Sequence, residues 1–162
     1  MIAEYVLLAG RIHREVSDLE RTVARAERAA RVAKSETSDS QPYIDSAALN
    51  LHGFYTGLER VFQQIAEIVD ESLPAGAEWH RTLLEQMCIE FPGVRPAVLS
   101  STTCQALDEF MRFRHVVRNV YAYNLNPDRV MQLVEDCARA FSQIKVELSH
   151  FALFLEQIGR EE

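Results

Sequence analysis

The chain has 162 residues, of which 48% are hydrophobic and 25% are charged, as is typical of one globular domain. A chain of this length can bury a hydrophobic core without disulfides or structural metals. Its 24 acidic and 17 basic residues give a formal net charge of −7, which disfavours nucleic-acid binding because neutralisation of phosphates supplies most of that affinity. Any RNA-binding role must therefore depend on a local basic patch.

The cysteines and the first residues of the chain bear on its cellular location. Cys88, Cys104 and Cys137 are widely spaced, odd in number and not arranged as a CxxC pair, so we expect unpaired thiols and no zinc site. The first apolar run is short and contains Glu4, so it predicts neither a signal peptide nor a membrane span. We expect a soluble, cytoplasmic protein with no membrane association and a single domain over residues 1–162.

A stripe of apolar residues, recurring at alternating spacings of three and four, predicts a long amphipathic helix from the N-terminus to about Lys34. After a short polar segment without periodicity, the same pattern predicts a second helix from about Ile44 to about Glu71. Gly53 and Gly57 lie inside it, and each costs about 1 kcal/mol relative to alanine. We attribute both to close packing between helices.

Three more helices are predicted in the second half of the chain. The first of them is a short helix over residues 79–91. The second runs from a cap at Ser100 or Ser101 to about Tyr123, and the third from about Asp128 to Gly159. No segment alternates between apolar and polar residues for long enough to predict a strand. The predicted fold is therefore all-α, an up-and-down bundle of four long helices plus one short helix.

The predicted helix that ends near Tyr123 carries the densest basic patch in this acidic chain. On a wheel of about 100° per residue, the side expected to face the core holds Phe110, Phe113, Val117, Val120 and Tyr121. Nearly opposite lie His115 and Arg118, three residues apart and therefore adjacent on one face, with Arg114 beside them. Arg112 and Asn119 flank the other edge. Such a stripe is often only a solvated helix face, and that alternative stays open.

These residue types suit the cleavage of RNA without a metal ion. The reaction needs a base for the proton of the ribose 2′-hydroxyl, an acid for the leaving oxygen, and cationic donors for the phosphate. Histidine can fill either proton role, and arginine can bind two phosphate oxygens at once. Asn119 could hold the nucleotide or orient the arginine. Two copies packed with these helices face to face would bring two His115 and two Arg118 into one cleft, so we expect a homodimer.

The segments 51–70, 74–87 and 113–130 together resemble the HepT-like branch of the HEPN superfamily. The resemblance covers most of the chain from Ala48 to Val134. It implies a HEPN-like helical bundle that forms a homodimeric ribonuclease toxin, with RNA as substrate and tRNA as one candidate. It also implies a minimal nucleotidyltransferase antitoxin as partner, which silences the toxin by adding AMP to a tyrosine. No cofactor or metal is implied.

The catalytic signature of this family is an arginine, often followed by a polar residue, and then a histidine after a further four to six residues. Arg118 and Asn119 match its start, but positions 123–125 hold Tyr, Asn and Leu where the histidine should fall. Two interpretations remain open: His115 replaces the missing imidazole, or the activity is weakened or lost. Tyr123 could donate a proton or a hydrogen bond in place of the histidine.

The resemblance also selects Tyr123 and Tyr121 as candidates for modification by AMP. Tyr123 is the better candidate because it lies near the predicted end of the helix, within reach of a modifying enzyme. Tyr121 is expected to pack in the core.

Three functions are consistent with the sequence. The first is an endoribonuclease toxin, with catalytic residues Arg118, His115 and Tyr123 and RNA-binding residues Arg112, Arg114 and Asn119. The second is a catalytically inactive HEPN dimer that only binds its nucleotidyltransferase partner. The third is a helical bundle without enzymatic function.

Histidines outside the basic helix have simpler interpretations. Glu147 and His150 form an ExxH pair, but the partner ligands of a di-iron site are missing, so no metal site is expected. His80 is interpreted as a capping residue at the start of the short helix. His52 and Glu59 could support the basic helix, although a partly exposed polar stripe is the simpler interpretation.

Overall fold

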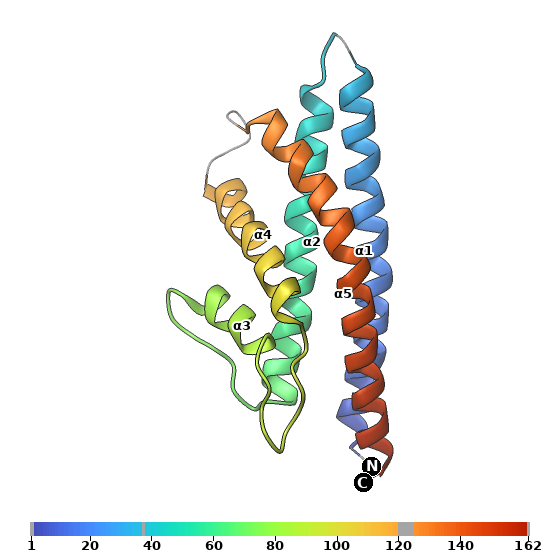
Figure 1. The fold of residues 1–162 in the computed structure, drawn as a ribbon, viewed down its shortest axis with the longest axis vertical. Coiled ribbons are helices and arrows are strands. Elements are labelled where there is room, and N and C mark those ends of the chain that lie inside the picture. The colour runs from blue at the N-terminus through green and yellow to red at the C-terminus, as the bar shows by residue number, and fades with distance from the viewer. Residues whose placement is uncertain (1, 37, 120–124, 162) are drawn as a thin grey trace.

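The computed structural model describes residues 2–36, 38–119 and 125–161, which fold as five α-helices and the segments between them. The helices are α1 (Ala3–Ser35), α2 (Gln41–Ile68), α3 (Trp79–Met87), α4 (Ser101–Asn119) and α5 (Pro127–Glu161). The four long helices alternate in direction, and both chain ends lie at the same end of the bundle (Figure 1). The described residues contain no strand, so the prediction of an all-α, up-and-down bundle with one short helix is confirmed.

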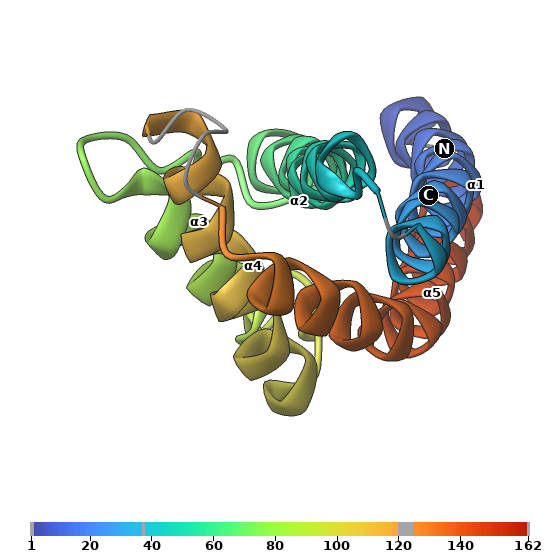
Figure 2. The ribbon, with the colours of Figure 1, turned by 90° about the horizontal axis from the view of Figure 1, so that it is seen from above.

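The helices form a bundle in which α2 and α5 pack against each other, and each of them also contacts both α1 and α4. The short α3 packs on α2 and α4. Seen from above, α3 and α4 therefore lie together on one side of α2, and α1 lies on the other (Figure 2). This side of the bundle, formed by α2, α3 and α4, holds the candidate site.

The core follows the apolar stripes predicted from the sequence, because each long helix turns one stripe inward. Phe54 of α2 lies at its centre and is fully buried. Its ring meets those of Phe110 in α4 and Phe141 in α5 edge to face, with centroids 5.8 Å and 6.1 Å apart. Burial of each such side chain contributes roughly 1.5–3 kcal/mol, so this trio fixes α4 against α2 and α5.

The two glycines of α2 differ in their surroundings. A Cβ atom at Gly57 would lie 2.8 Å from Leu19 Cδ2 and 2.6 Å from Glu15 Oε1, so the prediction of close helix packing is confirmed there. At Gly53 the nearest atom to such a Cβ would be Thr22 Cγ2 at 3.9 Å, an ordinary contact. The packing explanation is therefore wrong for Gly53.

A buried ion pair holds the connection between α3 and α4 against the end of α2. Arg95 Nε and Nη2 donate hydrogen bonds of 2.5 Å and 2.7 Å to the two carboxylate oxygens of Asp70, and both side chains are 0% exposed. The same guanidinium donates to the carbonyl oxygens of Gln86 and Ile89. Buried charges are stable only when paired and hydrogen-bonded in this way.

The helix α3 ends at Met87, earlier than the predicted end at Phe91. The backbone of Phe91 instead pairs with that of Arg95 through two hydrogen bonds of 3.0 Å. The guanidinium of Arg95 also lies over the Phe91 ring, 4.9 Å from its centroid. The buried arginine therefore sets where the helix stops, and periodicity alone could not show this.

The expectation of unpaired thiols is wrong for two of the three cysteines. Cys88, which follows α3, and Cys104, in the first turn of α4, form a disulfide with a Cα–Cα distance of 6.2 Å. The turn at Phe91 folds the chain back and brings together two cysteines that are 16 residues apart. Cys137 remains a free, buried thiol, and burial raises its pKa. No helix in the described part of the chain is long and apolar enough to cross a membrane.

Candidate functional site

The start of α4 is fixed by hydrogen bonds that also join it to α5. Ser100 caps the helix, as predicted, because its Oγ accepts a hydrogen bond of 3.3 Å from the backbone N–H of Thr103. The carboxylate of Glu147 in α5 accepts from the Ser100 N–H and from Thr103 Oγ1. Glu147 is therefore a structural residue of this junction. In the described ranges no three His, Cys, Asp or Glu side chains are grouped as metal ligands would be.

The apolar face of α4 is the one that its sequence predicts as far as Val117, but Arg114, predicted beside His115 on the outer face, turns inward and is only 15% exposed. Phe110 and Phe113 are buried, and Val117 is partly buried against the core. His115 is exposed on another face. Residues 120–124 lie outside the described residues, so the predicted inward positions of Val120 and Tyr121 are not tested.

A pocket of about 370 Å³ opens beside His115, between the start of α3 and the middle of α4. Its lining residues are Ala77, Glu78, His80, Arg81, Met111, Arg112, Arg114, His115 and Val116. The pocket therefore gathers two imidazoles and three guanidinium groups around one small cavity. This concentration of basic side chains stands out in a chain with a net charge of −7.

Beneath the pocket, one buried carboxylate binds two of these basic groups. Glu59 of α2 is 4% exposed. Its Oε2 atom lies 2.6 Å from His80 Nδ1, and its Oε1 atom lies 3.4 Å from Arg114 Nη2. Arg114 Nε donates to Thr56 Oγ1 at 3.4 Å. At 2.6 Å from the Glu59 carboxylate, His80 Nδ1 carries a proton and donates it in a hydrogen bond. The same nitrogen cannot also accept a hydrogen bond, so the 3.3 Å approach of Arg114 Nη1 to His80 Nδ1 is not one.

Two aromatic residues border this buried cluster. The Trp79 ring stacks on the His80 ring, with centroids 3.5 Å apart and planes inclined by 31°. The hydroxyl group of Tyr55 is buried and has no hydrogen-bond partner among the described residues. Burial, and then the nearby Glu59 carboxylate, raise the pKa of Tyr55 far above its ordinary value. The cluster is thus held in a largely water-excluded environment.

The predicted site residues of α4 divide into those that the structure places and those outside its description. His115 and Arg112 are exposed and line the pocket, and Arg112 Nη2 lies 2.8 Å from Asp108 Oδ2. Arg114 is only 15% exposed and turns toward Glu59. Arg118 and Asn119 lie in the last described turn of α4, but their side chains are outside the description. Tyr121 and Tyr123 lie wholly outside the described residues.

Sequence reasoning missed the contact between His80 and Glu59. The simpler interpretation of Glu59, as part of a partly exposed polar stripe, is wrong, because Glu59 is 4% exposed and binds His80, which α3 brings in from 21 residues further along the chain. The alternative, that Glu59 supports the basic helix, agrees with its 3.4 Å contact with Arg114. His80 was interpreted as a cap, but no side-chain cap occurs at the start of α3. The one available signal was that both residues lie in segments that carry the family resemblance.

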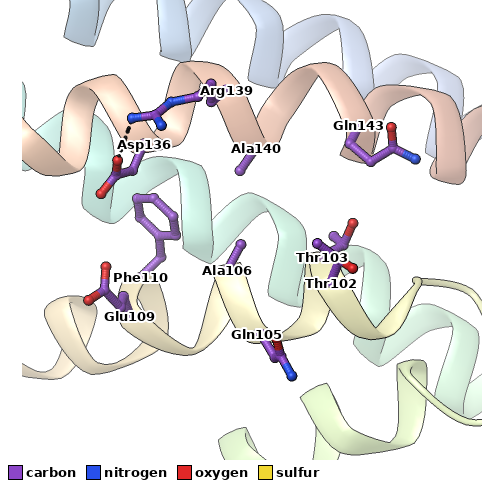
Figure 3. A pocket seen from close by; sticks show the side chains of 10 residues that line it. All are labelled: Thr102, Thr103, Gln105, Ala106, Glu109, Phe110, Asp136, Arg139, Ala140 and Gln143. Atoms are coloured by element: carbon purple, nitrogen blue, oxygen red, sulfur yellow. Dashed lines mark hydrogen bonds and ion pairs between the residues drawn. The ribbon is translucent and has the colours of Figure 1, made fainter.

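A second hollow, of about 410 Å³, lies between α4 and α5 (Figure 3). Ala106 and Ala140 face each other across it, and Glu109 lies on its rim. Its one arginine, Arg139, is paired with Asp136 at 2.8 Å. Among the described residues that line it there is no histidine, so they lack the imidazoles that the pocket beside His115 holds.

Comparison with known protein families matches residues 46–155 to the family described as HepT-like protein. The chain belongs to the HepT-like family. The resemblance stated from the sequence is thereby confirmed, and this HepT-like match covers α3 and α4 and most of α2 and α5. Every residue of the pocket and of the Glu59 cluster lies inside the HepT-like region, and α1 lies outside it. Searches of curated proteins and of solved structures gave no match.

Proposed function

We propose that this HepT-like protein is a metal-independent endoribonuclease and acts as the toxin of a toxin–antitoxin system. The observation that carries the proposal is the pocket beside His115, where two imidazoles and three guanidinium groups meet in an otherwise acidic chain. Imidazoles move protons near neutral pH, and guanidinium groups bind phosphate, so the lining has the groups that RNA cleavage requires. Membership of the HepT-like family supports the same chemistry.

In this proposal different residues of α4 and of the segment after it bind the phosphate, transfer protons and hold the RNA. Arg118 binds the scissile phosphate, His115 transfers a proton, and Tyr123 donates a proton or a hydrogen bond. Arg112 and Asn119 hold the RNA backbone. Arg112 suits this role because it is 67% exposed and, among the described residues, pairs with Asp108 alone, on its own helix. Such an exposed pair is worth about 0–1 kcal/mol. A phosphate can displace that carboxylate at little cost.

Arg114 contributes to RNA binding mainly through the pocket wall in this proposal. Its guanidinium is shared between Glu59 and Thr56, so part of its charge is already neutralised inside the protein. It fixes the position of α4 relative to α2 and leaves the outer edge of the pocket positive.

The assembly and its control follow from the family. We propose a homodimer in which the α4 helices of two copies face each other, so that two basic patches line one cleft for RNA. The proposed partner is a minimal nucleotidyltransferase antitoxin that adds AMP to Tyr123 or Tyr121. Co-expression with such an enzyme, followed by intact mass and peptide mapping, tests this step; a protein without added AMP would contradict it.

A second function is supported by one specific observation. Positions 123–125 hold Tyr, Asn and Leu where the family signature has histidine, which is what a catalytically inactive domain would show. In that case the protein would be a dimeric binding module for the nucleotidyltransferase, and the basic pocket would serve only to hold its ligand.

Expression of the protein alone in a bacterial host separates these two functions. The toxin predicts growth arrest with fragmented RNA, and the variants Arg118→Ala and His115→Ala are expected to relieve both effects. Arg139→Ala is the matched control, because it removes an exposed arginine of α5 that does not line the pocket. Normal growth with intact RNA, at a verified level of folded protein, would support the binding module instead.

A further inference from the structure

We propose that His80, oriented by Glu59, is the general base of this enzyme and works with His115 across one pocket within a single chain. This inference rests on the proposed ribonuclease function and adds a catalytic residue to it. His80 lies outside the family signature, and it supplies a second imidazole within one chain, so that one ring can accept a proton while the other donates one.

The buried Glu59 carboxylate orients the His80 imidazole. Glu59 Oε2 lies 2.6 Å from His80 Nδ1, so Nδ1 carries the proton and donates it to the carboxylate. The neutral ring then has its lone pair on Nε2, and the side chain is 25% exposed in the wall of the pocket. A carboxylate behind a histidine fixes the tautomer and stabilises the imidazolium that forms when the base takes a proton.

The His80 imidazole and the Glu59 carboxylate are held rigidly by their neighbours. The Trp79 ring stacks on the imidazole, and Arg114 holds the other carboxylate oxygen, so His80 is fixed on two sides. Apolar side chains of similar size would usually fill the place of a buried ionic group without loss of stability. An apolar side chain in the place of Glu59 could not orient a pocket histidine, so we attribute this carboxylate to the chemistry of the pocket as well as to the attachment of α4 through Arg114.

The pocket that His80 lines also holds a second imidazole and further guanidinium groups. His115 provides the second imidazole, and Arg81 and Arg112 provide guanidinium groups around it. A pocket of about 370 Å³ can hold one ribose with its 3′-phosphodiester. The ligand class is therefore an RNA strand, one nucleotide of which enters the pocket.

The reaction balances with these groups alone. His80 Nε2 takes the proton of the ribose 2′-hydroxyl, and the 2′-oxygen forms a bond to the adjacent phosphorus. The bond from phosphorus to the 5′-oxygen of the next nucleotide breaks, and protonated His115 gives its proton to that leaving oxygen. The products are a 2′,3′-cyclic phosphate and a 5′-hydroxyl, and proton exchange with water restores both imidazoles. No oxidant, reductant or metal is needed.

The test is cleavage of an oligoribonucleotide by the purified full-length protein and its variants. His80→Ala is expected to lower kcat by roughly 10²–10⁴-fold, the usual contribution of a general base, and free imidazole should restore part of the rate through the vacated space. Glu59→Gln is expected to lower kcat with little change in KM. The matched control is His150→Asn, since His150 is an exposed histidine of α5 outside this pocket.

A second variant separates catalysis from folding. The amide N–H of His80→Asn can still reach toward Glu59, but the side chain has no base, so it should melt like the wild type and remain inactive. Wild-type activity in His80→Ala or His80→Asn would overturn the role of His80 and leave the proposed function standing. A wild-type protein that leaves the RNA intact would overturn both. Loss of activity in the His80 variants with rescue by imidazole, but no rescue of Arg118→Ala, would establish the inference.

Discussion

Glu59 Oε2 of α2 lies 2.6 Å from His80 Nδ1 of α3, beneath the pocket that His115 of α4 lines. The same carboxylate meets Arg114 of α4 at 3.4 Å. Three helices therefore converge on one buried negative charge, and this convergence fixes the relative positions of the basic side chains above it. A site held in this way needs little rearrangement when a phosphodiester enters.

Arg112 and Arg114 are expected to behave differently although they are two residues apart. Arg112→Ala should leave the melting temperature unchanged but weaken RNA binding and lower the slope of log K against log salt concentration by about 0.7, the value for one lost contact with a single strand. Arg114→Ala should lower the free energy of unfolding by roughly 2–3 kcal/mol, because it leaves Glu59 with one fewer partner. Salt-dependent binding and urea unfolding measure the two effects. Equal behaviour of the two variants would show that the inward turn of Arg114 has no energetic consequence.

The Asp70–Arg95 ion pair should be essential for the stability of the turn between α3 and α4. Arg95→Met leaves a fully buried carboxylate without its charged partner, so the free energy of unfolding should fall by about 3–5 kcal/mol. Lys34→Met is the control, because Lys34 and Glu135 form an exposed pair that should contribute about 0–1 kcal/mol. Urea unfolding of both variants measures the two changes in the free energy of unfolding. A similar small decrease in both would contradict a stabilising role for the buried Asp70–Arg95 pair.

The Cys88–Cys104 disulfide should stabilise the attachment of α3 to α4. The two cysteines are 16 residues apart, and a loop of this size gives about 3 kcal/mol by the chain-entropy account. Denatured protein that has not been reduced should react with iodoacetamide at Cys137 alone, and reduction should expose all three thiols. Cys88→Ser should melt at a lower temperature than the wild type. Three reactive thiols before reduction would show that the bond does not form.

Tyr55 should make stability depend on pH in the alkaline range. Because the folded state raises its pKa, the unfolded chain loses the phenolic proton first, from its ordinary value of 10.0 upward. Above pH 10.0 the folded state therefore binds more protons than the unfolded chain, and the free energy of unfolding falls by up to about 1.4 kcal/mol per pH unit. Below pH 10.0 the contribution of Tyr55 to the free energy of unfolding does not change with pH.

The variant Tyr55→Phe isolates this effect. It should reduce the alkaline dependence to the part that the buried Cys137 thiol contributes, since burial raises the pKa of that thiol as well. At neutral pH it should raise the free energy of unfolding by about 1 kcal/mol, because it deletes a buried hydroxyl that has no hydrogen-bond partner among the described residues. Tyr43→Phe, at an exposed position, is the control. Urea unfolding at pH 8 and pH 11 measures both. An unchanged alkaline slope in Tyr55→Phe would contradict the burial of this hydroxyl.

The helices could be predicted from the sequence because their apolar stripes record which face each one buries. The predicted ends were correct to within a few residues for α1, α2 and α5, where proline or polar segments interrupt the pattern. The early end of α3 and the Cys88–Cys104 bond could not be predicted. Both depend on Arg95 reaching a carboxylate 25 residues earlier in the chain, and such a long-range pairing leaves no periodic signal in one sequence.

The candidate site was only half accessible to sequence reasoning. His115, Arg112 and Arg114 were found because they share one helix, and helical spacing shows which of its residues lie together. His80 and Glu59 come from two other helices, so their contact depends on how α3 packs against α2. Spacing along the chain carries no information about that packing, so the sequence predicts a partly exposed polar stripe where Glu59 is buried against α3 and α4.

The most direct measurement is the incubation of purified protein with RNA in the presence of a metal chelator, followed by analysis of the fragment ends. We expect cleavage that leaves 2′,3′-cyclic phosphate and 5′-hydroxyl ends, and its loss in Arg118→Ala, His115→Ala and His80→Ala. Intact RNA in the wild-type reaction, with correctly folded protein, would contradict the claim that this pocket cleaves RNA and would leave the protein as a binding module.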